Sequence, residues 1–227
     1  MIPTSKPTNS TPSITIFSYG SNMSNKELIK YSKKLTNTNP YQHFTILDTG
    51  YLPNHTFAYL PLKTKTNNPT LRTAKATILK STYHKQKNNK VYGTIAQVSK
   101  ELYRLILKKE GVYKNYYTLK TKTITSLISK EKYKAVVFVM TDYYIKKAID
   151  SETTTPNIQT TTQNIQTTTQ NIQTTTQNIQ TTPNMKHQKY DTPSHLPSKQ
   201  YENRIVKSAE AYKFPKNYIN TYLKTLK

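Results

Sequence analysis

Cysteine and tryptophan are absent from this chain of 227 residues, and glycine occurs only four times. Without cysteine the chain cannot form a disulfide, a thiolate zinc site or a cysteine nucleophile. No run of eighteen uninterrupted apolar residues occurs, and the N-terminal segment lacks the apolar stretch of a signal peptide. We therefore expect a cytoplasmic protein with no membrane partner.

Acidic residues are also scarce, because 11 Asp and Glu stand against 34 Lys and Arg, which gives a formal net charge of +23. Such a charge is typical of proteins that bind nucleic acid or an anionic surface. However, the lysines are spread along the chain without an arginine cluster, and Lys, Asn, Ile and Tyr all have AT-rich codons. The charge alone therefore favours nucleic acid only weakly as a partner.

The histidines show no spacing typical of metal ligands, and no cofactor motif is found, so we predict no metal site and no cofactor. The five histidines are His43, His55, His84, His187 and His195. Ser21, His43 and Asp48 supply the residue types of a hydrolase triad, but nothing in their spacing supports one.

Two segments have a composition that predicts disorder. Residues 1–13 are rich in Pro, Ser, Thr and Asn, and residues 151–192 contain the repeat NIQTTTQ, which starts at Asn157, Asn164 and Asn171. One apolar residue in seven cannot form the two-position seam of a coiled coil. We expect a disordered arm, a disordered insertion, and a single domain made of residues 14–149 and 193–227.

Alternating and helical patterns of apolar residues divide that domain into strands and helices. The expected strands are 13–18, one or two strands within 45–60, 72–80, 90–98, 116–124 and 133–141. The expected helices are 25–35, 99–107, 201–212 and 217–226, with Ser99 as a plausible N-cap. The pattern predicts a mixed α/β (α+β) domain of five or six strands with helices around a sheet or small barrel, and it leaves the topology open.

Because glycine is so scarce, we expect each glycine where a Cβ does not fit or where φ is positive. Gly20 lies in FSYGSNM between a strand and a helix, and such a turn presents backbone N–H groups that can hold an oxyanion or a carboxylate. Gly111 directly follows Glu110, which ends an apolar helix and is the only carboxylate in its neighbourhood. Both positions could equally be a simple turn and a simple helix end.

Three stretches resemble the γ-glutamylcyclotransferase family when taken in order. They are FSYGSNM, VYGTIAQVSKELYRLILKKEGVYKNYY and PSKQYENRIVKSAEAYKFPKNYINTYL. The resemblance covers residues 14–149 and 197–226. It implies a small, mostly antiparallel, barrel-like sheet of five to six strands with surrounding helices. It also implies an enzyme that converts a γ-glutamyl amino acid into 5-oxoproline and the free amino acid.

That reaction needs no enzymic nucleophile, because the α-amine of the substrate attacks the γ-carbonyl within the same molecule. It needs a base that removes a proton from the ammonium and returns one to the leaving nitrogen, and Glu110 is the candidate for both roles. By resemblance, the substrate-binding residues are Ile16, Phe17, Ser18, Tyr19, Gly20, Ser21, Asn22, Tyr117 and Tyr201. The N–H groups of the turn from Tyr19 to Asn22 could hold the developing oxyanion.

The sequence departs from the family pattern at three places. Ser208-Ala209 replaces Gly-Ala, Lys213-Phe214-Pro215 replaces Gly-Leu-Pro, and Thr73-Ala74-Lys75 stands where glycines often begin a strand. Two alternatives therefore stand beside the enzyme: a catalytically lapsed relative that binds γ-glutamyl groups, and a basic protein associated with nucleic acid on the same fold. The expected partner is a small γ-glutamyl molecule, and a homodimer is left open.

Overall fold

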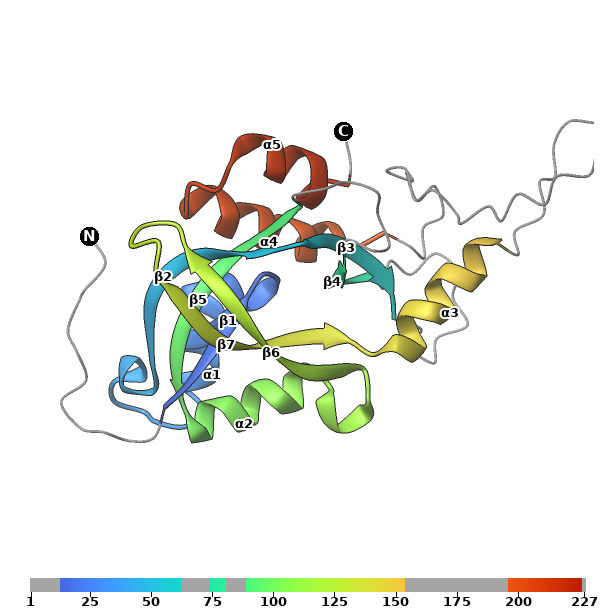
Figure 1. Ribbon diagram of the computed structural model, residues 1–227. Coiled ribbons are helices and arrows are strands. Elements are labelled where there is room, and N and C mark those ends of the chain that lie inside the picture. Colours follow the sequence, from blue (N-terminus) through green and yellow to red (C-terminus); the bar gives the residue numbers. More distant parts are fainter. Residues whose placement is uncertain (1–12, 63–73, 81–88, 154–195, 226–227) are drawn as a thin grey trace, which may run out of the picture.

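A closed five-stranded barrel forms the centre of the computed structural model, which describes residues 13–62, 74–80, 89–153 and 196–225. Around the barrel the strands follow the order β1 (Ser13–Ser18), β5 (Lys90–Ser99), β2 (Phe44–Pro53), β6 (Tyr117–Ser126) and β7 (Lys132–Met140). Neighbouring strands are antiparallel, except that β1 and β7 pair in parallel and close the barrel. This confirms the predicted mixed α/β fold with a mostly antiparallel barrel (Figure 1).

A second sheet of two antiparallel strands packs on the barrel. Its strands are β3 (His55–Pro61) and β4 (Ala74–Lys80), paired from His55 opposite Lys80 to Pro61 opposite Ala74. Thr77 of β4 is fully buried and accepts a hydrogen bond from the backbone N–H of Met140 in β7 at 3.1 Å. This bond ties the small sheet to the barrel wall.

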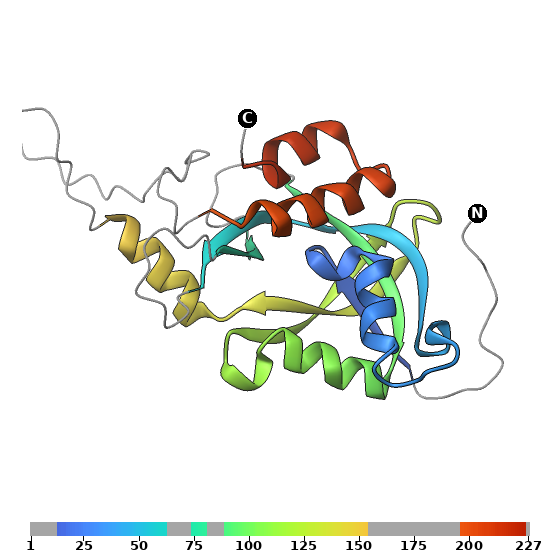
Figure 2. The same cartoon turned by 180° about the vertical axis from the view of Figure 1, so that it is seen from behind.

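Helices cover the barrel on several sides. α2 (Lys100–Lys109) lies on the side opposite the C-terminal helices α4 (Lys199–Ala211) and α5 (Lys216–Tyr218), and α1 (Asn25–Ser32) is seen best from behind (Figures 1 and 2). Short helical turns complete the set: η1 (Ser21–Met23), η2 (Pro40–His43), η4 (Val112–Lys114) and the π-helical η6 (Ile219–Leu223). Ser99 caps α2, as predicted, because its hydroxyl accepts from the N–H of Leu102 at 3.2 Å. No helix in these described ranges is long and apolar enough to cross a membrane.

One helix was not predicted. α3 (Asp142–Thr153) follows β7 and extends away from the barrel (Figure 1). Only Ile145 and Ala148 of its described side chains are buried, although the spacing of Ile145, Ala148 and Ile149 in the sequence was a usable helical signal. α3 runs past residue 149, where we expected the domain to be interrupted. The repeats that start at Asn157, like most of the predicted arm, lie outside the described residues.

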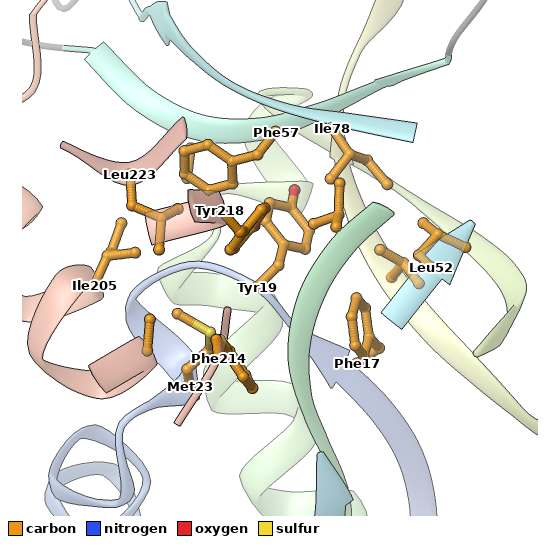
Figure 3. Packing of buried hydrophobic residues seen from close by; sticks show 14 of the residues in the cluster. Phe17, Tyr19, Met23, Leu52, Phe57, Ile78, Ile205, Phe214, Tyr218 and Leu223 are labelled. Atoms are coloured by element: carbon orange, nitrogen blue, oxygen red, sulfur yellow. The ribbon is translucent and has the colours of Figure 1, made fainter. Parts of the chain in front are cut away.

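The core divides into two clusters, because successive side chains of β1 point to opposite faces. Ile16 joins a cluster with Leu28, Leu102 and Ile106 under α1 and α2. Phe17, together with Tyr19 two residues further along, joins the other cluster, which lies between the barrel, the small sheet and the C-terminal helices. Figure 3 shows Tyr19 among side chains of the small sheet and of the C-terminal helices, with Phe17 of the barrel on its other side: Phe57, Ile78, Ile205, Tyr218 and Leu223.

Candidate active site

Glu110 is placed by the end of α2. Its backbone N–H completes the last helical turn by donating to the carbonyl oxygen of Ile106 at 2.8 Å, and buried Leu102 and Ile106 anchor the helix. Gly111 then adopts a left-handed conformation with φ of 66°, as we expected for a glycine here. A Cβ at Gly111 would lie 2.6 Å from Cδ2 of Tyr116, so the chain can turn at this point only without a side chain.

The Glu110 carboxylate lines a small pocket of about 30 Å³. The other lining residues come from β1, the turn after it, β4, β6, β7 and α4: Phe17, Ser18, Tyr19, Gly20, Ser21, Asn22, Ala76, Tyr117, Phe138 and Tyr201. The pocket thus brings together every residue that we expected at the site except Ile16. Ile16 is not among the lining residues, because it is fully buried and packs against residues of α1 and α2.

The two oxygens of the Glu110 carboxylate differ in their surroundings. Oε1 accepts a hydrogen bond from Nδ2 of Asn22 at 2.9 Å and lies 3.1 Å from Nζ of Lys109. Oε2 has no hydrogen-bond partner among the described residues. The side chain is 18% exposed, so one oxygen is held in place while the other remains available to a ligand.

The Lys109 ammonium occupies the polar end of the site. Its Nζ lies 2.8 Å from Oγ of Ser21, 2.5 Å from Oδ1 of Asn22 and 3.1 Å from Oε1 of Glu110. These three acceptors match the three donors of an ammonium group. Sequence reasoning missed Lys109, although its position next to Glu110 in KKEGV was a usable signal.

Three tyrosines that line the site come from separate elements. Tyr19 donates to the carbonyl oxygen of Phe138, and Tyr117 donates to the carbonyl oxygen of Ala76 at 2.7 Å. Tyr201 instead accepts from the N–H of Ala76 at 3.3 Å, and its hydroxyl also interacts with the Ser21 side chain. Burial raises the pKa of all three phenols and the Glu110 charge raises each further, so they stay protonated.

The turn after β1 contradicts one expectation. Gly20 has φ of −112° and ψ of −144°, outside the left-handed region, and a Cβ there would lie 3.4 Å from Cβ of Ala76 and 3.7 Å from the Tyr201 hydroxyl. Neither a positive φ nor a lack of space explains this glycine. The backbone N–H groups of Gly20, Ser21 and Asn22 have no hydrogen-bond partner in the described part of the chain, so they can receive an anionic oxygen.

The hydrolase triad is not assembled. Nδ1 of His43 lies 3.1 Å from Oγ of Ser99, and the Asp48 carboxylate binds the Thr49 N–H and the Ser126 hydroxyl. Across the described residues, no group of three or more His, Asp and Glu side chains could hold a metal ion.

A larger open groove of about 650 Å³ lies beside the start of α3. Its lining residues are Val112, Asn115, Tyr117, Thr118, Leu119, Thr141, Tyr143 and Tyr144. The groove touches the small pocket through Tyr117, but none of its lining residues is a carboxylate, a lysine or a histidine. The small pocket is therefore the candidate site for acid–base chemistry, despite its size.

The fold is similar to that of known structures. A structure described as gamma-glutamyl cyclotransferase superposes with a TM-score of 0.53 at 13% identity, over 92% of this chain and 85% of that chain. An uncharacterized protein from Homo sapiens superposes with a TM-score of 0.52 at 15% identity, again over 92% and 85%. No protein-family model and no curated protein sequence matches the chain. The likeness therefore shows a γ-glutamyl cyclotransferase-like fold, and the activity must be argued from the site.

Proposed function

We propose that this protein is a γ-glutamyl cyclotransferase, which converts a γ-glutamyl amino acid into 5-oxoproline and the free amino acid. The observation that carries the proposal is the partner-free Oε2 of Glu110, which lies in a pocket on a fold shared with a named cyclotransferase. A carboxylate with one oxygen fixed and one oxygen free is suited to move a proton without changing its position.

In the first step the α-ammonium of the substrate takes the place of the Lys109 ammonium, against Ser21, Asn22 and Glu110. Oε2 of Glu110 then accepts one proton from the substrate ammonium. The resulting amine attacks the γ-carbonyl carbon and forms the C–N bond of a five-membered ring. Because both groups belong to one molecule, holding the chain bent removes most of the entropic cost of this attack.

In the second step the carbonyl oxygen carries negative charge, which the free N–H groups of Gly20, Ser21 and Asn22 are placed to stabilise. Glu110 delivers the proton that it took from the substrate to the leaving nitrogen as the γ-carbon to nitrogen bond of the original amide breaks. The freed carboxylate then accepts the remaining extra proton of the ring nitrogen and passes it to the released amine, which departs as an ammonium. The carboxylate ends in its starting form, so no other reactant is required.

The pocket has room for only about one or two water molecules, so a γ-glutamyl group can enter only when side chains move. Lys109 is the first candidate to move, because its ammonium also lies 5.6 Å from the centre of the Tyr31 ring, outside the pocket. Because the Lys109 ammonium already occupies the acceptors of the site, the structure equally favours a second candidate function. This is a catalytically lapsed relative in which Lys109 stays bound to Glu110.

The two candidates are separated by incubating the purified protein with a panel of γ-glutamyl dipeptides and measuring released 5-oxoproline. The enzyme releases 5-oxoproline from at least one dipeptide, and its Glu110→Gln variant releases almost none. A lapsed relative releases none in either form. Absence of product from the whole panel would refute the proposed activity.

A further inference from the structure

Lys75 of β4 lies beside the pocket, and neither the fold nor the proposed chemistry accounts for it. The residue is half-buried, and its Nζ lies 4.6 Å from the centre of the Tyr201 ring. The next residue, Ala76, lines the pocket and binds the Tyr201 hydroxyl through its N–H. Lys75 therefore lies against a side chain that forms part of the pocket wall.

The Lys75 ammonium makes no hydrogen bond or ion pair with any described residue. The other cations near it have partners, because Lys109 binds Glu110 and Arg204 lies 3.1 Å from Oε1 of Glu27. Burial lowers the pKa of Lys75, and the neighbouring Lys109 lowers it further. A partly buried ammonium without an acceptor is costly to the fold, so its presence suggests an acceptor that arrives with a ligand.

The charges around the pocket also favour an anionic ligand. Lys75, Lys109 and Arg204 carry three positive charges, against the two negative charges of Glu27 and Glu110. A γ-glutamyl amino acid has one ammonium and two carboxylates, so its net charge of opposite sign complements the site.

We infer that Lys75 is a specificity-determining residue that binds a carboxylate of the substrate. This inference rests on the proposed function, in which Glu110, Asn22 and Ser21 receive the substrate ammonium. The carboxylate has two sources, the α-carboxylate of the γ-glutamyl head and the carboxylate of the leaving amino acid. Either one is an acceptor of the kind that the Lys75 ammonium, held against the Tyr201 ring, lacks among the described residues.

The test uses two substrates that differ in one group: a γ-glutamyl amino acid, and the γ-glutamyl derivative of the corresponding amine, which lacks the second carboxylate. The proteins are the wild type, Lys75→Met, Lys75→Arg and the control Lys80→Met, since Lys80 is exposed at the far end of the same strand. For each protein with each substrate, kcat and KM for release of 5-oxoproline are measured.

Lys75→Met is expected to raise KM by roughly 10- to 100-fold with little change in kcat, as when a charge-assisted hydrogen bond is lost. Lys75→Arg recovers part of the loss, and Lys80→Met behaves as the wild type. If Lys75→Met raises the KM equally for both substrates, the partner of Lys75 is the α-carboxylate of the γ-glutamyl head. If the KM rises only for the γ-glutamyl amino acid, the partner is the carboxylate of the leaving amino acid. An unchanged KM for both substrates overturns the inference.

Two further measurements separate the possible failures. The melting temperature of Lys75→Met is expected to equal or exceed that of the wild type, and a clear fall would show a structural role and overturn the inference. If the wild type releases no 5-oxoproline, the proposed function fails. Calorimetric titration of the same two compounds then decides: weaker binding to Lys75→Met supports the inference, and equal or absent binding to both proteins overturns it.

Discussion

Glu110 at the end of α2 and Glu202 in the first turn of α4 are both shielded carboxylates, yet they are held in opposite ways. Glu202 is only 5% exposed, and each of its oxygens accepts one hydrogen bond from Thr225, Oε1 from the backbone N–H and Oε2 from the hydroxyl, both at 2.7 Å. Glu110 is more exposed and has both of its partners on Oε1. The first carboxylate fastens the C-terminal segment, and the second keeps an oxygen free.

Two other buried carboxylates, Asp48 and Glu27, resemble Glu202 because both of their oxygens have partners. Asp48 binds the Thr49 N–H through Oδ1 and the Ser126 hydroxyl through Oδ2. Glu27 binds Arg204 through Oε1, and its Oε2 lies 3.5 Å from the Tyr31 hydroxyl. Burial alone would place Glu202 ahead of Glu110 as a candidate base. The occupancy of each oxygen, rather than the depth of the side chain, separates a carboxylate that can move a proton from one that holds structure.

The largest effect is expected for Glu110→Gln. The amide keeps the size of the side chain but cannot accept a proton, so turnover of a γ-glutamyl dipeptide should fall by ~10² to 10⁴-fold or more. The melting temperature should change little, because only partly exposed contacts are altered. Steady-state kinetics and thermal unfolding on one preparation check both statements, and retained turnover would remove Glu110 from the role of base.

Glu202→Gln should show the reverse pattern. The variant loses charge-assisted hydrogen bonds to Thr225, and the free energy of unfolding should fall by about 1–3 kcal/mol. For a chain of this length, that corresponds to a decrease in melting temperature of several degrees. Turnover at a temperature where the variant is folded should stay close to wild type. A loss of turnover as large as that of Glu110→Gln would contradict the distinction between the two carboxylates.

Lys109→Met should extend the comparison of Glu110 with Glu202, because it removes the ion-pair partner of Oε1 of Glu110. With the internal ammonium gone, the substrate ammonium no longer competes for Ser21, Asn22 and Glu110, and KM should fall by roughly 3- to 10-fold. Lys108→Met is the matched control, because Lys108 precedes it in the same helix and is exposed. A higher KM, or a collapse of kcat, would mean that Lys109 assists the reaction rather than filling the site.

Gly20→Ala should have the smallest effect on the fold. The backbone at Gly20 has a negative φ and the new methyl makes only ordinary contacts, so the stability cost should be about 1 kcal/mol or less. The methyl faces Ala76 and Tyr201 in a pocket with little spare room. The KM for a γ-glutamyl dipeptide should therefore rise clearly, while the melting temperature changes little. Unchanged KM with normal stability would leave Gly20 as a plain turn residue.

Local signals in the sequence predicted much of the fold. Ser99 and Gly111 mark the two ends of α2, and they place Glu110 before any tertiary contact is known. The prediction that close packing demands glycine holds for Gly50 and Gly93, which pair across β2 and β5 where a Cβ would overlap a neighbouring backbone oxygen. Each of these features is a property of one short segment.

The contacts between distant segments could not be predicted in the same way. The alternation of β4 separated Lys75 from Ala76, but no pattern in that strand says that Lys75 lies over the Tyr201 ring or that Ala76 binds the hydroxyls of Tyr201 and Tyr117. Ile16 shows the same limit, because a motif assigns a continuous stretch of residues to a pocket, whereas the fold packs Ile16 against residues of α1 and α2. The sequence could predict a candidate base, Glu110, but not the shape of the pocket around it.

The peptide units on either side of Ala76 join two tyrosines of the pocket wall at one point. The N–H of this residue holds the Tyr201 hydroxyl and its carbonyl holds the Tyr117 hydroxyl, so two tyrosines from α4 and β6 are attached to one residue of β4. β4 belongs to the two-stranded sheet, whereas Tyr117 belongs to the barrel, and the Thr77–Met140 bond ties the two together. A single residue of the small sheet therefore sets the spacing between α4 and the barrel wall at the site.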